Sequence, residues 1–420
     1  MSEPAVVAVK RAPRRPARPN TRSRANPGRV AAARALLAVD DEGRNVEEAL
    51  AEFVPGDPAD RALAWNLALG VLRHRAALDE AITTAARRAV WTLDPPVLSA
   101  LRAGLYELAF TRTPPHAAVD QGVELARALG AAHAAGFVNA ILRRGVVPLE
   151  GDVSLGFPAW MIARWRSRLG SPRADSYMRA CAEPAAVHLV VKEDPAGVAA
   201  SFQKAGIVLV PAGEGVFRLP ARSGRVDELP GFAEGRWWIM DPAAVAVADL
   251  VPNVAEVLDV CAAPGGKSLR LAARGMRVTA TDLDAERLAR IAENAARVGL
   301  SVPSNVHDWS AAPMAGAWPA VLVDAPCTAL GLVRRHPEIR WRRTEADVAI
   351  AAARQAKILS NAASCVAPGG ALIYAVCSPE PEEGPMIAAK LGWPVEATYS
   401  NEGNPEGADV FWGCRMRRPA

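Results

Sequence analysis

The sequence is short of the residues that build metal sites and disulfide scaffolds. It has six cysteines and six histidines in 420 residues, and no two cysteines form a Cys-x-x-Cys pair. A zinc site or a disulfide framework is therefore not expected, and we predict no metal and a reducing, cytoplasmic setting. Long uncharged apolar runs are also missing, which argues against a membrane-spanning helix and predicts no membrane partner.

Positive charge comes almost entirely from arginine, because lysine is scarce. The formal net charge is +4 at pH 7, and the pI is about 8.8. This balance permits a nucleic-acid partner but does not require one. With 50% hydrophobic and 22% charged residues the composition is globular, and the length suits two or three domains.

Residues 1–28 form a basic segment in which prolines alternate with arginines. Proline blocks helix formation and like charges repel, so we expect this segment to be disordered. No apolar core follows it, so it is not expected to be a secretory signal. Two functions stay open for it: a solubilising extension, or an arm that binds phosphate groups without sequence preference.

Residues 29–148 show apolar residues at helical spacing. Leu98, Leu101 and Leu105 recur on one face, and proline pairs punctuate the segment. We predict an all-α bundle in which these stripes form the core and not a cofactor site.

Residues 149–240 mix the two patterns. The spacing predicts strands at Val187–Val191 and Ile207–Val210, and helices at Trp160–Leu169 and Val198–Ala205. We interpret the segment as a small α+β module.

Residues 241–420 alternate short apolar runs with longer helix-like stretches. The predicted strands are Val257–Val260, Val278–Thr281, Val321–Asp324 and Ala371–Tyr374. Such alternation predicts a mostly parallel sheet wrapped by helices. The expected fold is therefore multidomain, with an N-terminal all-α bundle, a small α+β linker module and a C-terminal α/β Rossmann-like domain.

A turn of small residues follows the first of these strands. Gly265 and Gly266 let a ligand approach the backbone, at the strand edge where open α/β sheets bind ligands. Asp282 ends the second strand, where a carboxylate can bond ribose hydroxyls, while Asp284 is a candidate helix cap. Asp308 follows the third strand, and either an adenine contact or a surface turn suits it. Because neither phosphate-binding loop pattern is present, the cofactor expected is S-adenosylmethionine and not NAD.

Two cysteines follow two of the predicted strands. Cys327 comes three residues after Asp324, and Cys377 comes three residues after Tyr374. One cysteine in such a place is usually a small buried hydrophobe, but two at one sheet edge favour a nucleophile for an electron-poor ring carbon. A free thiol has a pKa of about 8.5, so we expect the site to favour the thiolate.

These residues resemble the bacterial Sun/RsmB family of ribosomal RNA cytosine-C5 methyltransferases. The C-terminal match comprises Asp259–Ser268, Asp324–Cys327, Arg334–Glu338, Tyr374–Ser378 and Glu382–Glu383. The N-terminal match is to the family's NusB-like RNA-binding domain and comprises Arg61–Ala64, Gly70–Arg73 and Phe137–Arg144. The resemblance implies a NusB-like domain at 29–148 and a class I S-adenosylmethionine-dependent catalytic domain at 241–420. One departure is Val376, where the family more often has threonine.

The resemblance also implies roles for single residues. Cys377 would attack carbon 6 of cytosine, Cys327 would assist product release, and Asp324 would hydrogen-bond the cytosine edge. Lys267 would lie in the same pocket. The residues that would bind the cofactor are Cys261, Ala262, Ala263, Pro264, Gly265, Gly266, Lys267, Asp282, Asp308 and Asp324.

A basic segment follows Cys327. Its candidate RNA-contacting residues are Arg334, Arg335, Arg340, Trp341, Arg342 and Arg343. Arginine pairs with phosphate, and tryptophan can stack on a base. Since a stacked base cannot expose carbon 6, the target must be single-stranded or flipped out. We therefore favour RNA contact over a solvated basic helix end.

The function favoured is methylation of a cytosine in RNA, most compatible with 16S ribosomal RNA of the small subunit, by a monomer with no DNA partner. Two alternatives are a transfer-RNA methyltransferase and a non-catalytic RNA-binding assembly factor. The presence of Cys327 and Cys377 argues against the assembly factor. A small-molecule methyltransferase or a cysteine-dependent hydrolase ranks lower.

Overall fold

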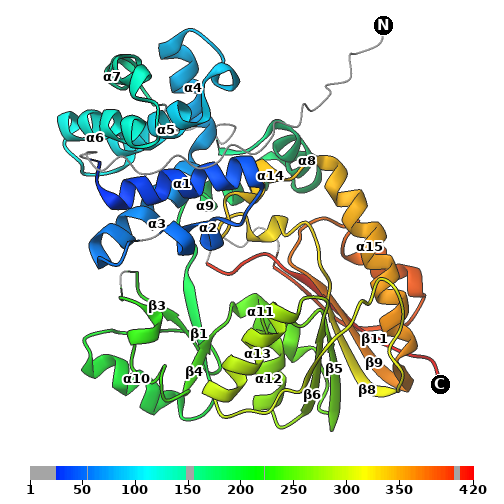
Figure 1. Cartoon of the computed structure of the whole chain (residues 1–420). Coiled ribbons are helices and arrows are strands. Elements are labelled where there is room, and N and C mark those ends of the chain that lie inside the picture. Colours follow the sequence, from blue (N-terminus) through cyan, green and yellow to red (C-terminus); the bar gives the residue numbers. More distant parts are fainter. Residues whose placement is uncertain (1–24, 54, 148–155, 222, 402–406) are drawn as a thin grey trace, which may run out of the picture. The chain divides into compact units, whose positions relative to one another are not determined.

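The structure is a computed structural model that describes residues 25–53, 55–147, 156–221, 223–401 and 407–420. The chain forms two compact units, one up to residue 151 and one from residue 152 (Figure 1). Most of the basic segment 1–28 lies outside the described residues, and the three domain boundaries, after residues 28, 148 and 240, stay predictions. Among the described helices, none combines the length and apolar character needed to cross a membrane.

The first unit is a bundle of helices, as predicted. Its helices are α1 (Pro27–Glu42), α2 (Val46–Phe53), α3 (Pro58–Arg73), α4 (Arg75–Ala86), α5 (Pro95–Phe110), α6 (Pro115–Ala128) and α7 (Ala135–Arg144). Helix α5 contacts α1, α3, α4, α6 and α7. Leu101 and Leu105 on α5 are fully buried, which confirms that the apolar stripe belongs to the core.

Several of these helices begin with a polar cap followed by proline. Asn26 precedes Pro27, and its side chain accepts the Arg29 N–H; Asp57 has the same role before Pro58 in α3. A short polar side chain satisfies a free N–H at the helix start, and the fixed φ of proline suits the first turn. The cap and the proline that follows it therefore fix the residue at which each of these helices begins.

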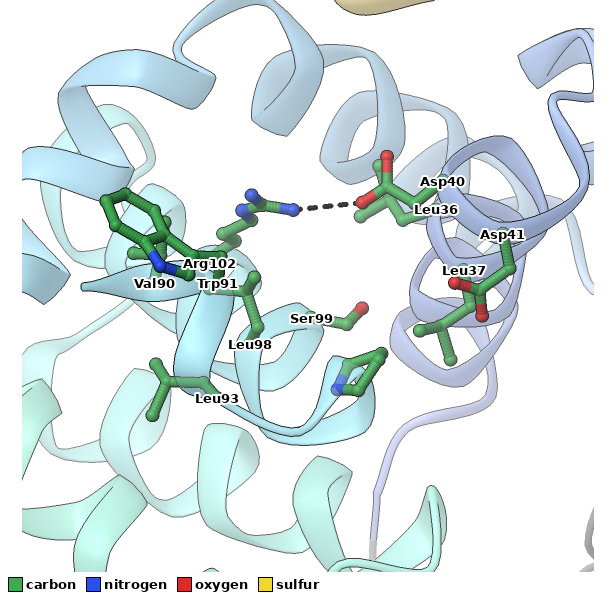
Figure 2. Close-up of a pocket in the computed structure, with 11 residues that line it drawn as sticks. Leu36, Leu37, Asp40, Asp41, Val90, Trp91, Leu93, Leu98, Ser99 and Arg102 are labelled. Carbon is green, nitrogen blue, oxygen red and sulfur yellow. Dashed lines mark hydrogen bonds and ion pairs between the residues drawn. The ribbon is translucent and has the colours of Figure 1, made fainter. Parts of the chain in front are cut away.

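A buried arginine joins three helices of the bundle. Arg102 on α5 is 5% exposed and donates to both carboxylate oxygens of Asp79, at 2.7 and 2.8 Å, and to Asp40 at 3.0 Å. Figure 2 shows the Arg102–Asp40 bond at one side of a pocket that also includes Trp91. Since a buried guanidinium needs partners, these carboxylates fix the approach of α1 and α4 to α5.

The second unit begins with a small α+β module. Helices α8 (Ala159–Leu169) and α9 (Ser171–Ala180) precede a four-stranded sheet of order β2-β3-β1-β4 that carries α10 (Pro195–Lys204). Its strands are β1 (Val187–Val191), β2 (Val210–Gly213), β3 (Val216–Leu219) and β4 (Trp237–Ile239).

The prediction of a strand at Ile207–Val210 is wrong except for its last residue, Val210, where β2 begins. The N–H of Ile207 donates to Phe202 O at 3.0 Å, after Gly206 with φ 78°. This bond closes the end of α10 and uses the backbone donor that a strand would need.

The rest of the second unit is a seven-stranded sheet of order β10-β11-β9-β8-β5-β6-β7. Its strands are β5 (Glu256–Val260), β6 (Arg277–Asp282), β7 (Ser304–Val306), β8 (Trp318–Asp324), β9 (Val366–Val376), β10 (Val395–Ser400) and β11 (Trp412–Arg417). The five strands from β9 to β7 are parallel, and β11 pairs antiparallel with both β9 and β10. The expectation of a mostly parallel, Rossmann-like sheet is confirmed.

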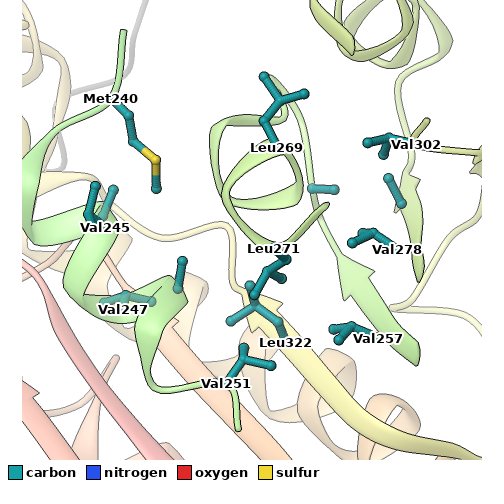
Figure 3. Close-up of a cluster of buried hydrophobic side chains, with 14 of the residues drawn as sticks. Met240, Val245, Val247, Val251, Val257, Leu269, Leu271, Val278, Val302 and Leu322 are labelled. Atoms are coloured by element: carbon teal, nitrogen blue, oxygen red, sulfur yellow. The ribbon is translucent and has the colours of Figure 1, made fainter. Parts of the chain in front are cut away.

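Both faces of this sheet are covered. On one face, Val257 and Leu322 of the strands pack with Leu269 of α12 and Val247 of α11 (Figure 3). On the other, residues such as Leu258 pack with α15 and α16. The helices are α11 (Pro242–Asp249), α12 (Gly266–Ala273), α13 (Ala285–Arg297), α14 (Ile339–Arg342), α15 (Glu345–Ser364) and α16 (Pro385–Ala388). Burial on both faces explains why the central strands are rich in apolar residues.

The bundle offers a test of close helix packing at Gly70. A Cβ at this position would overlap the ring of Tyr106, whose side chain is buried and bonded to Asn66. We expect Gly70→Ala to destabilise the bundle by about 1–3 kcal/mol through overpacking. The midpoint of urea unfolding, followed by far-ultraviolet circular dichroism, measures this change.

Gly136→Ala is the matched control, because a Cβ there meets nothing within 4 Å on α7. It should be neutral or stabilising by up to about 1 kcal/mol, from helix propensity alone. Equal midpoints for the two variants would contradict the packing explanation.

Candidate active site

The turn after β5 has the backbone that its small residues predict. Cys261 has φ 59° and Gly265 has φ 101°, and the Gly265 N–H donates to Ala262 O at 2.8 Å. A Cβ at Gly265 would come within 2.9 Å of Ile291. Glycine is therefore required here by the left-handed backbone and by the packing of α13 against the turn.

Asp282 lies directly against this turn. It is 5% exposed, and its carboxylate accepts the Ala263 N–H at 3.1 Å and the Asp284 N–H at 3.2 Å. Asp284 itself caps α13 by accepting two backbone N–H groups, as predicted. The carboxylate of Asp282 thus holds the turn at the end of β6.

Asp308 follows β7, the strand beside β6. Its carboxylate accepts both the N–H and the hydroxyl of Ser310, at 2.9 and 2.6 Å, and these bonds lower the pKa of Asp308. The structure therefore places Asp308 at the same sheet edge as Asp282, in a turn of its own.

Lys267 and Asp324 form an ion pair next to the turn. Lys267 Nζ lies 2.6 Å from Asp324 Oδ2, and the two side chains are 10% and 28% exposed. Burial lowers the pKa of Lys267, but the charge and hydrogen bond of Asp324 and the charge of Asp259 raise it, so the net shift is upward. Lys267 is thus a fixed cation, held at the carboxyl end of β8.

The two cysteines meet at this edge. Cys327 lies in the loop after β8, Cys377 follows β9 directly, and their Sγ atoms are 3.3 Å apart. Both are half-buried free thiols. Asp324 pairs with Ala375 in the parallel β8–β9 ladder, so the two strands end side by side. The expectation that both cysteines share an edge with the glycine turn is confirmed by this geometry.

The expectation of a favoured thiolate is not met in the free protein. The Cys327 hydrogen bond raises the pKa of Cys377 well above its ordinary value, and burial and the negative charge of Asp324 act in the same direction. The positive charge of Lys267 opposes them. The groups around Cys377 therefore disfavour its thiolate in the free protein.

The chain matches known families in both halves. A model described as 16S rRNA methyltransferase RsmB/F matches residues 247–391, and the NusB family model matches residues 26–146. Ribosomal RNA small subunit methyltransferase B of Xanthomonas campestris is 37% identical over 370 residues, which cover 83% of this chain and 84% of that protein. The protein of the same name from Xylella fastidiosa is 34% identical over 408 residues, or 93% and 96% of the two chains.

The chain belongs to the RsmB/F family of 16S rRNA methyltransferases. It is an RNA methyltransferase, and its cofactor is S-adenosylmethionine. The fold agrees: a structure named PH0851 is similar with a TM-score of 0.79 at 20% identity, covering 94% of this chain and 99% of that one. NSun6 from Pyrococcus horikoshii, determined with SFG, is similar over 63% of this chain and 99% of that one, with a TM-score of 0.56 at 16% identity.

The residues at this edge of the RsmB/F enzyme fit a nucleoside cofactor. Asp282 and Asp308 end neighbouring strands, which provides carboxylates for ribose hydroxyls or an amino group. Leu283 follows Asp282 and Val306 ends β7, and these side chains are 53% and 59% exposed. An aromatic base would cover such apolar side chains favourably.

The basic segment needs a correction. Arg340 is 1% exposed, and its guanidinium donates to the carbonyl oxygens of Gly156, Cys181 and Val333. It holds the α8–α9 region against α14 and is removed from the predicted RNA-contacting set, because no surface is left for phosphate.

Other arginines of the segment also have protein partners. Arg335 donates to Asp409 and Asp241, at 2.8 and 3.2 Å, and Arg343 donates to Thr328 O at 3.0 Å. Arg342 is exposed and Trp341 is half-exposed. The residues that suit RNA contact are therefore fewer than the sequence predicted.

Sequence reasoning missed a buried network beside the cysteines. Glu383, fully buried, accepts hydrogen bonds from Thr328 and Ser378. Glu383 was part of the family resemblance but received no role. It is one of three glutamates between residues 380 and 383, so the sequence offered no signal that distinguishes it.

The negative charge of Asp324 should raise the pKa of the Cys377 thiol. In Asp324→Asn, loss of the negative charge stabilises the Cys377 thiolate, and Lys267 loses its partner. We expect the midpoint of Cys377 alkylation by iodoacetamide, plotted against pH, to fall by about one pH unit. Mass spectrometry of the modified peptide measures the midpoint for this cysteine alone.

Asp249→Asn is the control, because Asp249 pairs with Arg270 and Arg274 and with neither cysteine. It should leave the midpoint unchanged. An unchanged or higher midpoint in Asp324→Asn would contradict the electrostatic explanation.

Proposed function

We propose that this enzyme methylates carbon 5 of a cytosine in 16S ribosomal RNA through a covalent cysteine adduct. The observation that carries the proposal is the pair of thiols 3.3 Å apart at the strand edge that also holds Lys267 and Asp324. The proposed catalytic residues are Cys377, Cys327, Asp324 and Lys267. We also propose a cytoplasmic location, since ribosomal RNA is the substrate, while a monomer and the absence of a DNA partner stay predictions.

Carbon 5 of cytosine is a poor nucleophile until the ring is activated. In the proposed first step, Cys377 Sγ forms a bond to carbon 6, and the ring electrons move toward carbon 5. Asp324 would hydrogen-bond the polar edge of the base and support the activated ring. The pKa of Cys377 is raised in the free protein, so in this step its proton passes to water as the base enters. A shift of the Lys267–Asp324 pair would favour this loss.

Bound S-adenosylmethionine supplies an electrophilic methyl group for carbon 5. The proton on carbon 5 then passes to water, and the electrons of that bond restore the double bond of the ring. The Sγ–carbon 6 bond breaks, and Cys377 leaves as a thiolate that takes up a proton. Cys327, adjacent to Cys377 Sγ, would assist this release. Two thiols in contact thus suit a reaction with separate attack and elimination steps.

Replacing each cysteine should separate these steps. Cys377→Ala should abolish methyl transfer, because no nucleophile remains to activate the ring. Cys327→Ala should form the adduct and fail to release it, leaving a protein–RNA complex that survives denaturing electrophoresis. Incubation with RNA and methyl-labelled cofactor tests both variants.

Cys365→Ala is the matched control, since this buried thiol donates to Met314 O and precedes β9, at the opposite end of that strand from Cys377. It should retain turnover. Full turnover by Cys377→Ala would overturn the nucleophile assignment. Bisulfite sequencing of total RNA, with and without the gene, distinguishes ribosomal from transfer RNA as the substrate.

The arginines of the basic segment should divide into two classes. Arg342→Ala should weaken RNA binding at low salt and leave the unfolding temperature unchanged, because the side chain is exposed. Arg340→Ala should lower the unfolding temperature, since it leaves buried carbonyl groups unpaired. Filter binding and thermal unfolding measure the two effects, and the reverse pattern would contradict this division.

A further inference from the structure

We infer that Glu383 is a positioning residue that sets the distance between the two sulfur atoms of the active site. The inference rests on the proposed function, in which Cys377 attacks and Cys327 assists release. Glu383 touches neither sulfur and no reacting atom. It acts through the residues that follow each cysteine in the chain, Thr328 and Ser378.

The carboxylate of Glu383 connects the two cysteine loops directly. Oε1 accepts the backbone N–H of Thr328 at 2.7 Å, and Oε2 accepts its hydroxyl at 2.5 Å. Oε2 also accepts the hydroxyl of Ser378. One rigid, planar group is therefore bonded to the residue next to Cys327 and to the residue next to Cys377.

Glu383 is itself held in place. Its backbone carbonyl accepts the hydroxyl of Tyr374 at 2.6 Å, and Gln355 Nε2 donates to Oε1 at 3.3 Å and to Pro326 O at 3.2 Å. Glu383, Gln355 and Ser378 are each fully buried. A carboxylate is costly to bury unless its oxygens are bonded, and here the donors come from both loops at once.

The burial of Glu383 is not explained by packing alone. A buried apolar residue would fill the same space without desolvating a charge. Burial raises the pKa of Glu383, although the hydroxyls of Ser378 and Thr328 oppose this shift. The carboxylate provides what an apolar residue cannot, which is a fixed separation between two loops 50 residues apart in the chain.

Disulfide formation between Cys327 and Cys377 reports this separation without RNA or cofactor. One thiolate attacks oxidised dithiothreitol to give a mixed disulfide, and the second thiolate attacks that bond. A Cys327–Cys377 disulfide forms, and dithiothreitol leaves in its reduced form, whose two sulfurs take up the two protons that the cysteine thiols lose. The rate of the second attack depends on how close the sulfurs are held.

The test uses the full chain and compares Glu383→Ala with Glu382→Gln. Glu382 is the adjacent carboxylate, pairs with Arg164 and bonds to neither cysteine loop in the described contacts. We expect Glu383→Ala to slow formation of the Cys327–Cys377 disulfide about tenfold, while Glu382→Gln matches the unchanged protein. Peptide mass spectrometry identifies the disulfide.

The kinetic constants kcat and KM provide a second measurement, which a purely structural role of Glu383 would leave unchanged. Glu383→Ala should lower kcat about a hundredfold through misplaced sulfurs and leave KM for RNA unchanged. Glu383→Gln, which keeps an acceptor for the Thr328 N–H, should recover part of both the disulfide rate and kcat. If Glu383→Ala does not fold, Ser378→Ala carries the test, because it removes one donor from the connection.

An unchanged disulfide rate in folded Glu383→Ala or Ser378→Ala would overturn the inference. This outcome is separate from failure of the proposed function, which would appear as methylation without an adduct in the unchanged protein. A slower disulfide rate together with a raised KM and unchanged kcat would also overturn the positioning role, because RNA binding would then be what Glu383 supports.

Discussion

The active site depends on the parallel pairing of β8 with β9. This ladder sets Asp324 opposite Ala375, so the chain leaves both strands at the same height and two cysteines 50 residues apart come into contact. The neighbouring β5–β8 ladder brings the turn with Lys267 to the same place. The carboxyl ends of adjacent parallel strands share one edge of a sheet. The strand order therefore brings these side chains together, and the loops adjust the distances between them.

At this edge the charges disfavour ionisation of Cys377, the proposed nucleophile. Asp324 neutralises Lys267 and, with Cys327, disfavours ionisation of Cys377. A permanently ionised thiolate would be open to oxidation and alkylation. In the proposed mechanism, entry of a base would rearrange the Lys267–Asp324 pair and so restrict reactivity to the complex with substrate.

Burial decides which polar groups support the site and which are left for RNA. Arg340 and Arg335 lie in the predicted RNA-contacting segment, yet their guanidinium groups are bonded to carbonyl and carboxylate oxygens of the protein. Arg343 likewise bonds Thr328 O, next to Cys327. In this segment arginine therefore builds the loop that follows the first cysteine, and exposed Arg342 is the clearest remaining candidate for a phosphate contact.

Local sequence pattern was enough to predict the helical bundle, the strands β5, β6, β8 and β9, the glycine turn and the shared edge of the cysteines. Helical periodicity and caps depend on neighbouring residues, and ligands of open α/β sheets bind at the carboxyl ends of the strands. Pattern could not separate a buried arginine from an exposed one in a run of arginines, nor assign Glu383 a role. Those outcomes depend on partners distant in the chain: Arg340 meets Cys181, and Glu383 meets Thr328. The sequence by itself determined which residues are candidates for the chemistry. Only the tertiary structure decided the direction of the Cys377 pKa shift and the spacing of the two sulfurs, since both follow from which groups are brought within hydrogen-bonding distance.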